Sequence, residues 1–152
     1  MNVSISRRAL MVLAGALCAG AISFAQAAPV TFTVPLTGAQ QVPPVETSGT
    51  GSANISYDPD TRVVTWAITF SGLSSDTTMA HFYGPAASGK NAPVEVWLSE
   101  KGAAITSPVN GTATLSPADA QEFLAVQMYV NVHTKDHPAG EIRGQVVPPK
   151  SN

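Results

Sequence analysis

Three histidines are the side chains of this sequence best suited to hold a metal ion: His81, His133 and His137. Two of them fall in segments with strand-like alternation, Thr77–Tyr83 and Gln127–His133, and are expected to project from polar strand faces. Neutral imidazole binds copper and zinc well, so two or three converging histidines would make a site for either ion. They converge only if the two strands are neighbours. Alternatively, each ring is a structural group with one N–H paired to a backbone carbonyl, and the loop residue His137 is the least favoured ligand.

Four other side chains could support such a site or form a separate one. Met79 and Met128 each offer a thioether for copper(I). Trp97 and Tyr129 fall on the outward faces of their predicted strands. They could form an aromatic patch for a partner or a sugar, or they could pack under loops.

One strand face near the C-terminus carries Glu141, Arg143 and Gln145. Arg143 could donate two hydrogen bonds to a carboxylate or sulfate ligand. The favoured alternative is that it forms an ion pair with a neighbour such as Glu95. The first alternative predicts a binding surface and the second a structural contact.

Composition narrows the classes of function. The chain has 152 residues, 44% of them hydrophobic and 12% charged, and its 8 Lys and Arg stand against 10 Asp and Glu. This balance excludes a nucleic-acid binder that works by bulk charge, and it is not typical of a disordered chain. The sequence also lacks the motifs of serine hydrolases, zinc proteases and phosphate-binding loops. A compact domain rich in turns remains.

The N-terminal residues predict export. Arg7 and Arg8 precede an apolar run over residues 9–24, and Ala-Gln-Ala at 25–27 matches a small-residue cleavage site. The run is shorter than the roughly 20 residues that a membrane-spanning helix needs. Residues 1–27 are therefore expected to be a cleaved signal peptide, and the paired arginines also resemble a twin-arginine signal.

Cleavage would leave one mature domain, residues 28–152, in the periplasm or outside the cell. The only cysteine, Cys18, lies in the segment that is removed. We therefore expect neither a disulfide nor a thiolate ligand in the mature domain.

The mature sequence consists of short predicted strands separated by turn residues. Residues 64–70 show the clearest alternation of apolar and polar side chains. Ser116 and Pro117 predict the start of a two-turn helix that runs to Leu124, and Asn110-Gly111 predicts a tight turn. The predicted strands are Val30–Thr37, 53–57, 64–70, Thr77–Tyr83, Val94–Ser99, Gly111–Leu115, Gln127–His133 and Glu141–Val147.

This pattern predicts an all-β fold, namely an antiparallel, Greek-key-like β-sandwich of about eight strands with one short helix. Repeated βα units are absent from the sequence. The two longest loops, residues 40–51 and 84–93, are where such a fold is expected to carry function.

Three ordered motifs resemble the CHRD domain, the module named after chordin. The opening motif covers residues 36–51, the central motif residues 80–86, and the closing motif residues 129–134 and 138–145. The resemblance implies an all-β extracytoplasmic domain. In chordin, such domains belong to a secreted antagonist of growth factors, whereas bacterial members stand alone behind a signal peptide, so no growth-factor partner is expected here.

The resemblance also singles out side chains. His81 and His133 lie where the family motifs carry histidine, and Tyr83 stands where the central motif often has a second one. This implies a copper or zinc site at His81 and His133, with His137 as a further candidate and Tyr83 as an oxygen donor or hydrogen-bonding partner. The closing motif adds side chains expected to be structural: Asn131, Glu141, Arg143 and Gln145.

The leading hypothesis is an exported, non-catalytic module that binds copper, zinc, a small ligand or a protein. We expect no nucleic-acid partner and no membrane span in the mature part. Two other classes stay open. A metal-dependent redox enzyme of dismutase type would add turnover, and a structural or adhesive module would use Trp97 and Tyr129.

Overall fold

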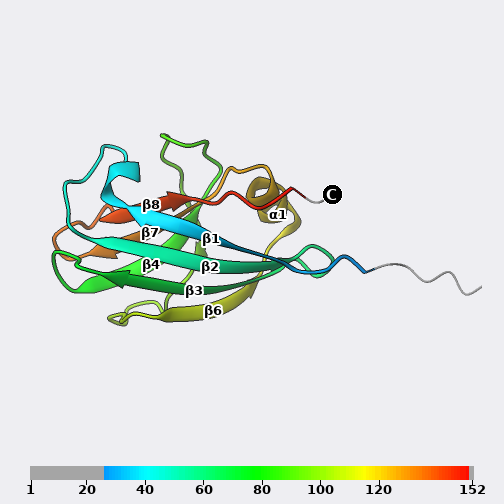
Figure 1. Ribbon diagram of the computed structural model, residues 1–152, viewed down its shortest axis with the longest axis horizontal. Coiled ribbons are helices and arrows are strands. Elements are labelled where there is room, and N and C mark those ends of the chain that lie inside the picture. The colour runs from blue at the N-terminus through cyan, green and yellow to red at the C-terminus, as the bar shows by residue number, and fades with distance from the viewer. Residues whose placement is uncertain (1–25, 151–152) are drawn as a thin grey trace, which may run out of the picture.

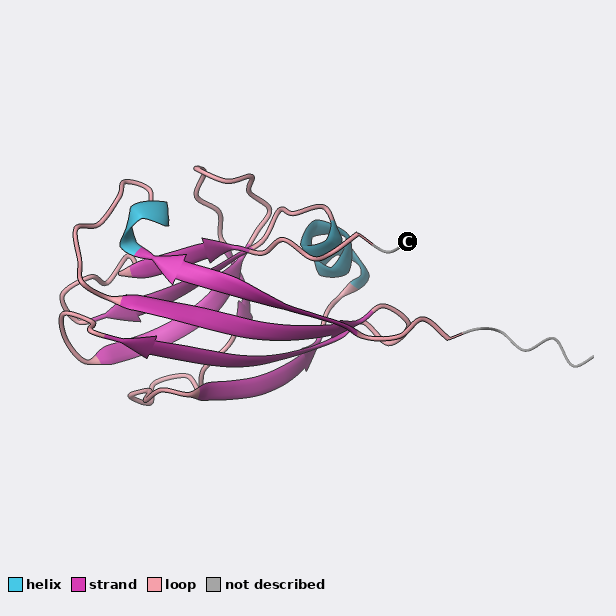
Figure 2. Cartoon of the chain, viewed as in Figure 1, coloured by secondary structure: helices cyan, strands magenta, loops and turns pink. Residues whose placement is uncertain are grey.

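The computed structural model describes residues 26–150. Residues 1–25 of the predicted signal peptide lie outside the described residues. Eight strands are present within this range (Figure 1): β1 (Val30–Thr37), β2 (Thr50–Asp58), β3 (Val63–Ser71), β4 (Thr77–Tyr83), β5 (Val94–Trp97), β6 (Val109–Thr114), β7 (Tyr129–Thr134) and β8 (Ile142–Gln145). A 3-10 turn, η1 (Gly38–Gln40), and one helix, α1 (Pro117–Leu124), are the helical elements (Figure 2). The prediction of an all-β fold with one short helix is confirmed. Neither described helical element has the length and apolar character to cross a membrane.

All eight strands pair antiparallel in one sheet, in the order β5-β4-β7-β8-β1-β2-β3-β6. The two four-stranded halves of this sheet meet at a single register pair, Thr37 with Arg143. The sheet curls so that its halves face each other (Figure 1). Trp66 on β3 donates from Nε1 to the carbonyl of Leu98, just after β5, at 3.0 Å. The two layers expected of a sandwich are therefore halves of one nearly barrel-shaped sheet.

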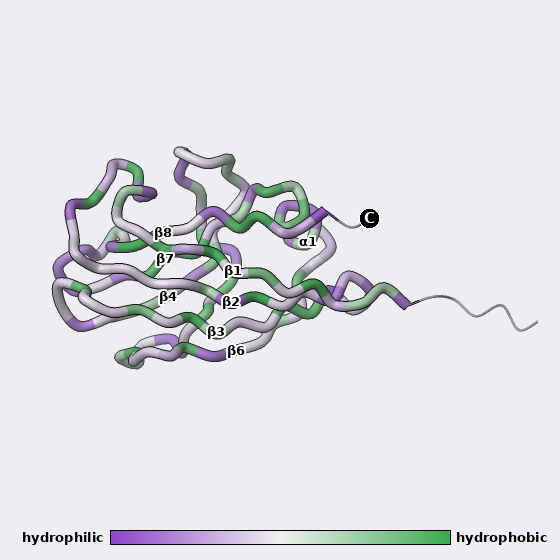
Figure 3. Tube along the Cα trace, viewed as in Figure 1, coloured by the Kyte–Doolittle hydropathy of each residue, from purple (hydrophilic) through white to green (hydrophobic). Residues whose placement is uncertain are grey.

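The inward side chains of both halves form one hydrophobic core. In β3, Val64, Trp66 and Ile68 are buried while Thr65 and Thr69 are exposed, as the alternation predicts. Figure 3 shows hydrophobic positions interspersed with more hydrophilic ones along the strands. The core includes these inward residues: Val34, Leu36, Ala53, Ile55, Ala80, Phe82, Val130, Val132 and Ile142.

Helix α1 closes one end of the core. The Ser116 hydroxyl accepts from the Asp119 N–H at 3.1 Å, and the Asp119 carboxylate accepts from the Ser116 N–H at 3.3 Å. This reciprocal pair is a capping box and explains why the helix begins there. Phe123 of α1 then packs against three aromatic rings: Phe32, Tyr57 and Phe82.

The predicted turn at Asn110-Gly111 is wrong. Both residues lie within β6, and Gly111 pairs with Trp66 on β3. A Cβ at position 111 would overlap the Trp66 indole. The glycine therefore lets a large ring approach the backbone of a strand.

Candidate functional site

The candidate site lies on the outward side of β4, β7 and β8, which loops cover. We call this side the covered face and define it by eight side chains: His81, Tyr83, Tyr129, Asn131, His133, Glu141, Arg143 and Gln145. Alternation turns them away from the core, as predicted. All of them except Tyr83 and Gln145 are nevertheless buried.

A buried cation holds one of the covering loops. Arg143, 2% exposed, donates from Nη1 to Oδ1 of Asn91 at 3.0 Å and from Nη2 to the carbonyl of Lys90 at 2.6 Å. Its guanidinium carbon lies 3.4 Å from the centroid of the Tyr129 ring, a cation–π contact. The predicted ion pair with Glu95 is not found among residues 26–150. Both Nη atoms face a loop of the protein itself instead of an open ligand surface.

A buried anion holds the opposite end of the covered face. Glu141 is 0% exposed, and its carboxylate accepts hydrogen bonds from the Thr47 hydroxyl (2.6 Å), the Thr134 hydroxyl (2.7 Å) and both the N–H (2.8 Å) and hydroxyl (2.7 Å) of Ser74. Burial alone would raise the pKa of Glu141, but the hydrogen bonds from Thr47, Thr134 and Ser74 lower it below its usual value. The ionised carboxylate thus joins β7 to the β1–β2 and β3–β4 loops.

Two amide side chains complete the cover. The amide of Gln41 lies 2.7 Å from the amide of Asn131, which also donates to the carbonyl of Ala139 at 3.2 Å. Gly140 has φ 118°, and the Asn131 amide fills the space where a Cβ would stand. Gln41 is not among the predicted site residues, and its only signal in the sequence is its place in the opening motif.

Gln145 makes hydrogen bonds that hold neighbouring segments to β8. Its side-chain N–H groups donate to the carbonyls of Ala86 (3.0 Å) and Val126 (2.8 Å), and its backbone N–H donates to the Gln40 side chain (3.2 Å). It thereby ties the 84–93 loop and the segment after α1 to β8.

The two predicted strand histidines meet beside Tyr83. β4 and β7 are neighbours, and Nδ1 of His81 lies 3.4 Å from Nε2 of His133. The Tyr83 hydroxyl lies 3.0 Å from Nε2 of His133 and 3.5 Å from Nδ1 of His81. We call these three side chains the His–His–Tyr triad.

The hydrogen bonds fix the protonation of one ring and leave the other incomplete. Nδ1 of His133 lies 2.9 Å from the Pro138 carbonyl, which can only accept, so Nδ1 carries the proton and Nε2 has a free lone pair. The Tyr83 hydroxyl donates to that lone pair. Nε2 of His81 is buried without a hydrogen-bond partner in the described part of the chain. Its Nδ1 contacts, at 3.4 and 3.5 Å, exceed the usual hydrogen-bond length.

Burial keeps the triad uncharged. Desolvation, together with nearby His133, lowers the pKa of His81 to about 4. Burial also lowers the pKa of His133, with a partial offset from its bond to Pro138. Burial and the neighbouring Tyr129 raise the pKa of Tyr83 to about 12. At neutral pH the triad therefore presents two neutral imidazoles and a phenol.

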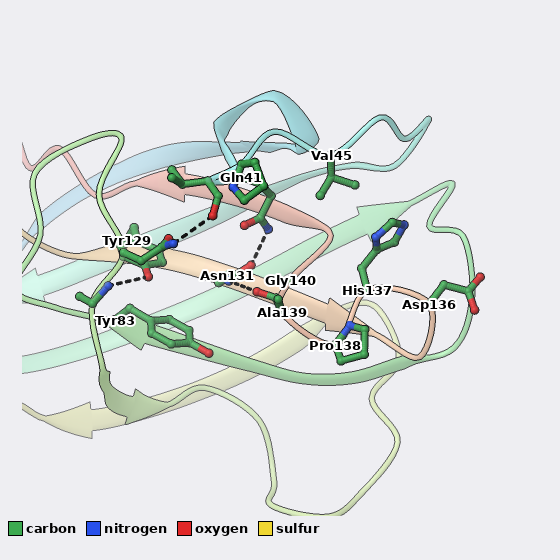
Figure 4. A pocket seen from close by; sticks show the side chains of 14 residues that line it. Gln41, Val45, Tyr83, Tyr129, Asn131, Asp136, His137, Pro138, Ala139 and Gly140 are labelled. Carbon is green, nitrogen blue, oxygen red and sulfur yellow. Dashed lines mark hydrogen bonds between the residues drawn. The ribbon is translucent and has the colours of Figure 1, made fainter.

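His137 does not join the triad. It is half-buried and lines, with Asp136, a cavity of about 360 Å³ between the covering loops. Figure 4 shows these two residues at one end of the cavity and Tyr83 and Tyr129 at the other. Tyr83 is thus the member of the triad that also lines the cavity. Within residues 26–150, no three His, Cys, Asp or Glu side chains group as a metal cluster.

The two outward aromatic residues differ in their surroundings. Trp97 on β5 is 39% exposed, and its ring meets the His81 ring edge to face, with centroids 4.2 Å apart. Tyr129 is buried and stacks between the Tyr83 ring and Arg143. Tyr129 therefore follows the second alternative and packs under a loop. Of the two residues, Trp97 is the one that is open to a partner.

Comparison with known proteins gives one match. A family model described as the CHRD domain matches residues 32–146. The matched range contains the opening, central and closing motifs and every residue of the covered face. Neither a curated protein nor a solved structure matches the chain.

Proposed function

The chain belongs to the CHRD-domain family, and from that premise we propose that it is an exported binding module that holds a copper or zinc ion in the His–His–Tyr triad. The family supports a binding or structural module in general. The ion is the specific part of the proposal, and the geometry of the triad supports it.

The size of the triad is the observation that carries the proposal. Its three donor atoms form a triangle with edges of 3.0, 3.4 and 3.5 Å. An ion equidistant from them would lie about 1.9 Å from each in their plane and about 2.0 Å when displaced from it by about 0.6 Å, close to the bond lengths of zinc with nitrogen and oxygen. The triad therefore has the dimensions of three ligands around one small ion.

The competing explanation is a purely structural hydrogen-bond network. That role fits the bonds from His133 to Pro138 and from Tyr83 to His133. It fits His81 poorly, because a buried structural imidazole is expected to have partners for its ring nitrogens. His81 has one unpartnered nitrogen and two long contacts at the other.

Export is the second part of the proposal, supported by the N-terminal sequence. A basic pair, an apolar run and a small-residue site precede the domain. Fractionation of cells that express the full chain, with N-terminal sequencing of the product, tests it. Mature protein that begins at Ala28 in the periplasm or medium is expected, and uncleaved protein in the cytoplasm would contradict it.

The ion is tested with tag-free protein expressed from the full chain, treated with chelator and titrated separately with copper and zinc. We expect about one equivalent of bound copper or zinc by mass spectrometry for the wild type. The His81→Ala/His133→Ala double variant, shown to be folded by circular dichroism, should lose it. His137→Ala is the matched control and should retain it.

Two outcomes would contradict the proposal. The wild type could bind neither ion, or the double variant could bind as much as the wild type. Equal loss of metal in His137→Ala would move the site to the cavity and overturn the assignment to the triad.

A further inference from the structure

A thioether is an unassigned donor on the strand that carries two residues of the triad. The described chain contains two methionines, and the structure separates them. Met128 is fully buried in the hydrophobic core. Met79 lies on β4 two residues before His81, so that alternation turns both side chains to the covered side of the sheet.

Met79 is also paired directly with His133 across β4 and β7. Side chains at paired positions of an antiparallel sheet have their Cβ atoms about 4.5–5.5 Å apart. Methionine has three rotatable side-chain bonds and adapts its shape to its surroundings. The sulfur of Met79 therefore starts within reach of the ion position that the proposed function assigns.

The charge of the donor set bears on which ion would bind. Two imidazoles, a phenol and a thioether are all neutral donors. The nearest carboxylate of the covered face, Glu141, already accepts four hydrogen bonds, and no third His, Cys, Asp or Glu of residues 26–150 joins the two histidines. Only the Tyr83 phenol could ionise to offset part of the charge of a bound ion, so a monovalent ion needs less compensation in this buried site than a divalent one.

Met79 also faces solvent on its other side. With Trp97 it lines a second cavity of about 350 Å³, which shares no lining residue with the cavity that contains His137. The ring of Trp97 covers His81. An ion arriving through this cavity would meet the thioether before the imidazoles.

We infer that Met79 supplies a fourth donor to the His–His–Tyr triad and that the site selects copper(I) over zinc(II). This inference rests on the proposed function and adds the identity of the ion and one ligand. A soft thioether favours copper(I), while zinc has no such preference for it over oxygen or nitrogen donors. The neutral donor set and the sulfur therefore act in the same direction.

The test compares two matched variants of the tag-free protein, Met79→Leu and Met128→Leu. Both replace a methionine by a side chain of similar volume without sulfur, a change that cores usually tolerate. Copper(I) affinity is measured without oxygen against a coloured copper(I) chelator, and zinc affinity against a coloured zinc chelator. We expect Met79→Leu to weaken copper(I) binding by about tenfold or more, equivalent to about 1.4 kcal/mol, and to leave zinc binding unchanged. Met128→Leu should change neither.

Each other outcome has a distinct meaning. Unchanged copper(I) affinity in Met79→Leu, or tighter binding of zinc than copper(I) by the wild type, would overturn the inference and leave the proposed function intact. Failure of the wild type to bind either ion would overturn both. Weakened copper(I) binding in Met128→Leu as well would show a general effect of packing and would also overturn the assignment to Met79.

Discussion

The two outer faces of the sheet have the same alternation but opposite environments. The outward side of β1, β2, β3 and β6, which we call the open face, carries mainly small uncharged side chains, among them Thr31, Thr33, Ser52, Asn54, Ser56, Thr65, Thr69 and Thr112. Those side chains lie at the surface and bond one another, as Thr33 does with Asn54 at 2.7 Å. The covered face carries one buried cation, one buried anion and two buried histidines.

The two faces differ in the hydrogen-bond partners that are available to their polar groups. On the open face, water can replace any side-chain partner, so each contact contributes little. On the covered face, water is excluded, and each polar atom needs a partner of its own. Glu141, Arg143 and Asn131 have such partners. His81 instead has no partner at Nε2 and only long contacts at Nδ1. This exception is why the triad, and not the open face, is the candidate site.

The largest expected effect follows from removing the buried anion. Glu141→Ala leaves the donors of Thr47, Ser74 and Thr134 unpaired, so we expect a loss of about 3–5 kcal/mol in the free energy of unfolding. Urea denaturation measures it. Glu46→Ala, an exposed carboxylate in a neighbouring loop, is the control and should cost about 0.5 kcal/mol or less. A Glu141→Ala variant within about 1 kcal/mol of the wild type would show that the covered face does not depend on its anion.

A somewhat smaller effect is expected from the buried cation. Arg143→Lys keeps the positive charge. It loses the two guanidinium hydrogen bonds, to the Lys90 carbonyl and the Asn91 side chain, and the stacking on the Tyr129 ring. We expect a loss of about 2–3 kcal/mol. Hydrogen exchange should also become faster in residues 84–93. Unchanged exchange in that loop would mean that Arg143 does not hold it.

The pH dependence of stability tests the buried histidines of the covered face. In the unfolded chain His81 takes up a proton near its usual pKa of 6.5, whereas burial lowers the folded value to about 4. Between these values the unfolded state binds more protons, so the stability of chelator-treated protein should fall as the pH falls, by about 2 kcal/mol from pH 7 to pH 5. The His81→Ala/His133→Ala variant should lack this slope, since most carboxylates do not titrate in that range. A slope equal to that of the wild type would assign it elsewhere.

The smallest effect is expected on the open face. Thr65→Lys and Asn54→Lys place a charge on exposed positions of β3 and β2. We expect changes within about 0.5 kcal/mol in urea denaturation, because both side chains reach water. A loss of more than about 2 kcal/mol would mean that this face is buried against something in solution.

The sequence predicts the strands because their signal is local. The alternation of buried apolar residues with Thr65, Ala67 and Thr69 predicts β3, and the Ser116–Asp119 pattern predicts α1. Asn110-Gly111 misleads because the turn preference of the pair is overridden by Trp66, which is distant in sequence but needs the space at Gly111.

The candidate site was predictable only in part for the same reason. Alternation puts His81 and His133 on one side of their strands, and the family resemblance marks both residues. That β4 and β7 are neighbours depends on the order of the whole sheet. Burial of Arg143 and Glu141 depends on loops whose path no local pattern fixes. The contact of Arg143 with Asn91 instead of Glu95 follows from that path.

The central claim is that the His–His–Tyr triad, in which Nδ1 of His81 has only contacts of 3.4 and 3.5 Å, is an ion site. A crystal structure of the protein loaded with copper, with anomalous diffraction at the copper edge, tests it most directly. We predict one peak at about 2.0–2.1 Å from both Nδ1 of His81 and Nε2 of His133, the distances expected for metal–imidazole bonds. A peak at His137, or no peak with the hydrogen bond from Tyr83 to His133 intact, would contradict the account.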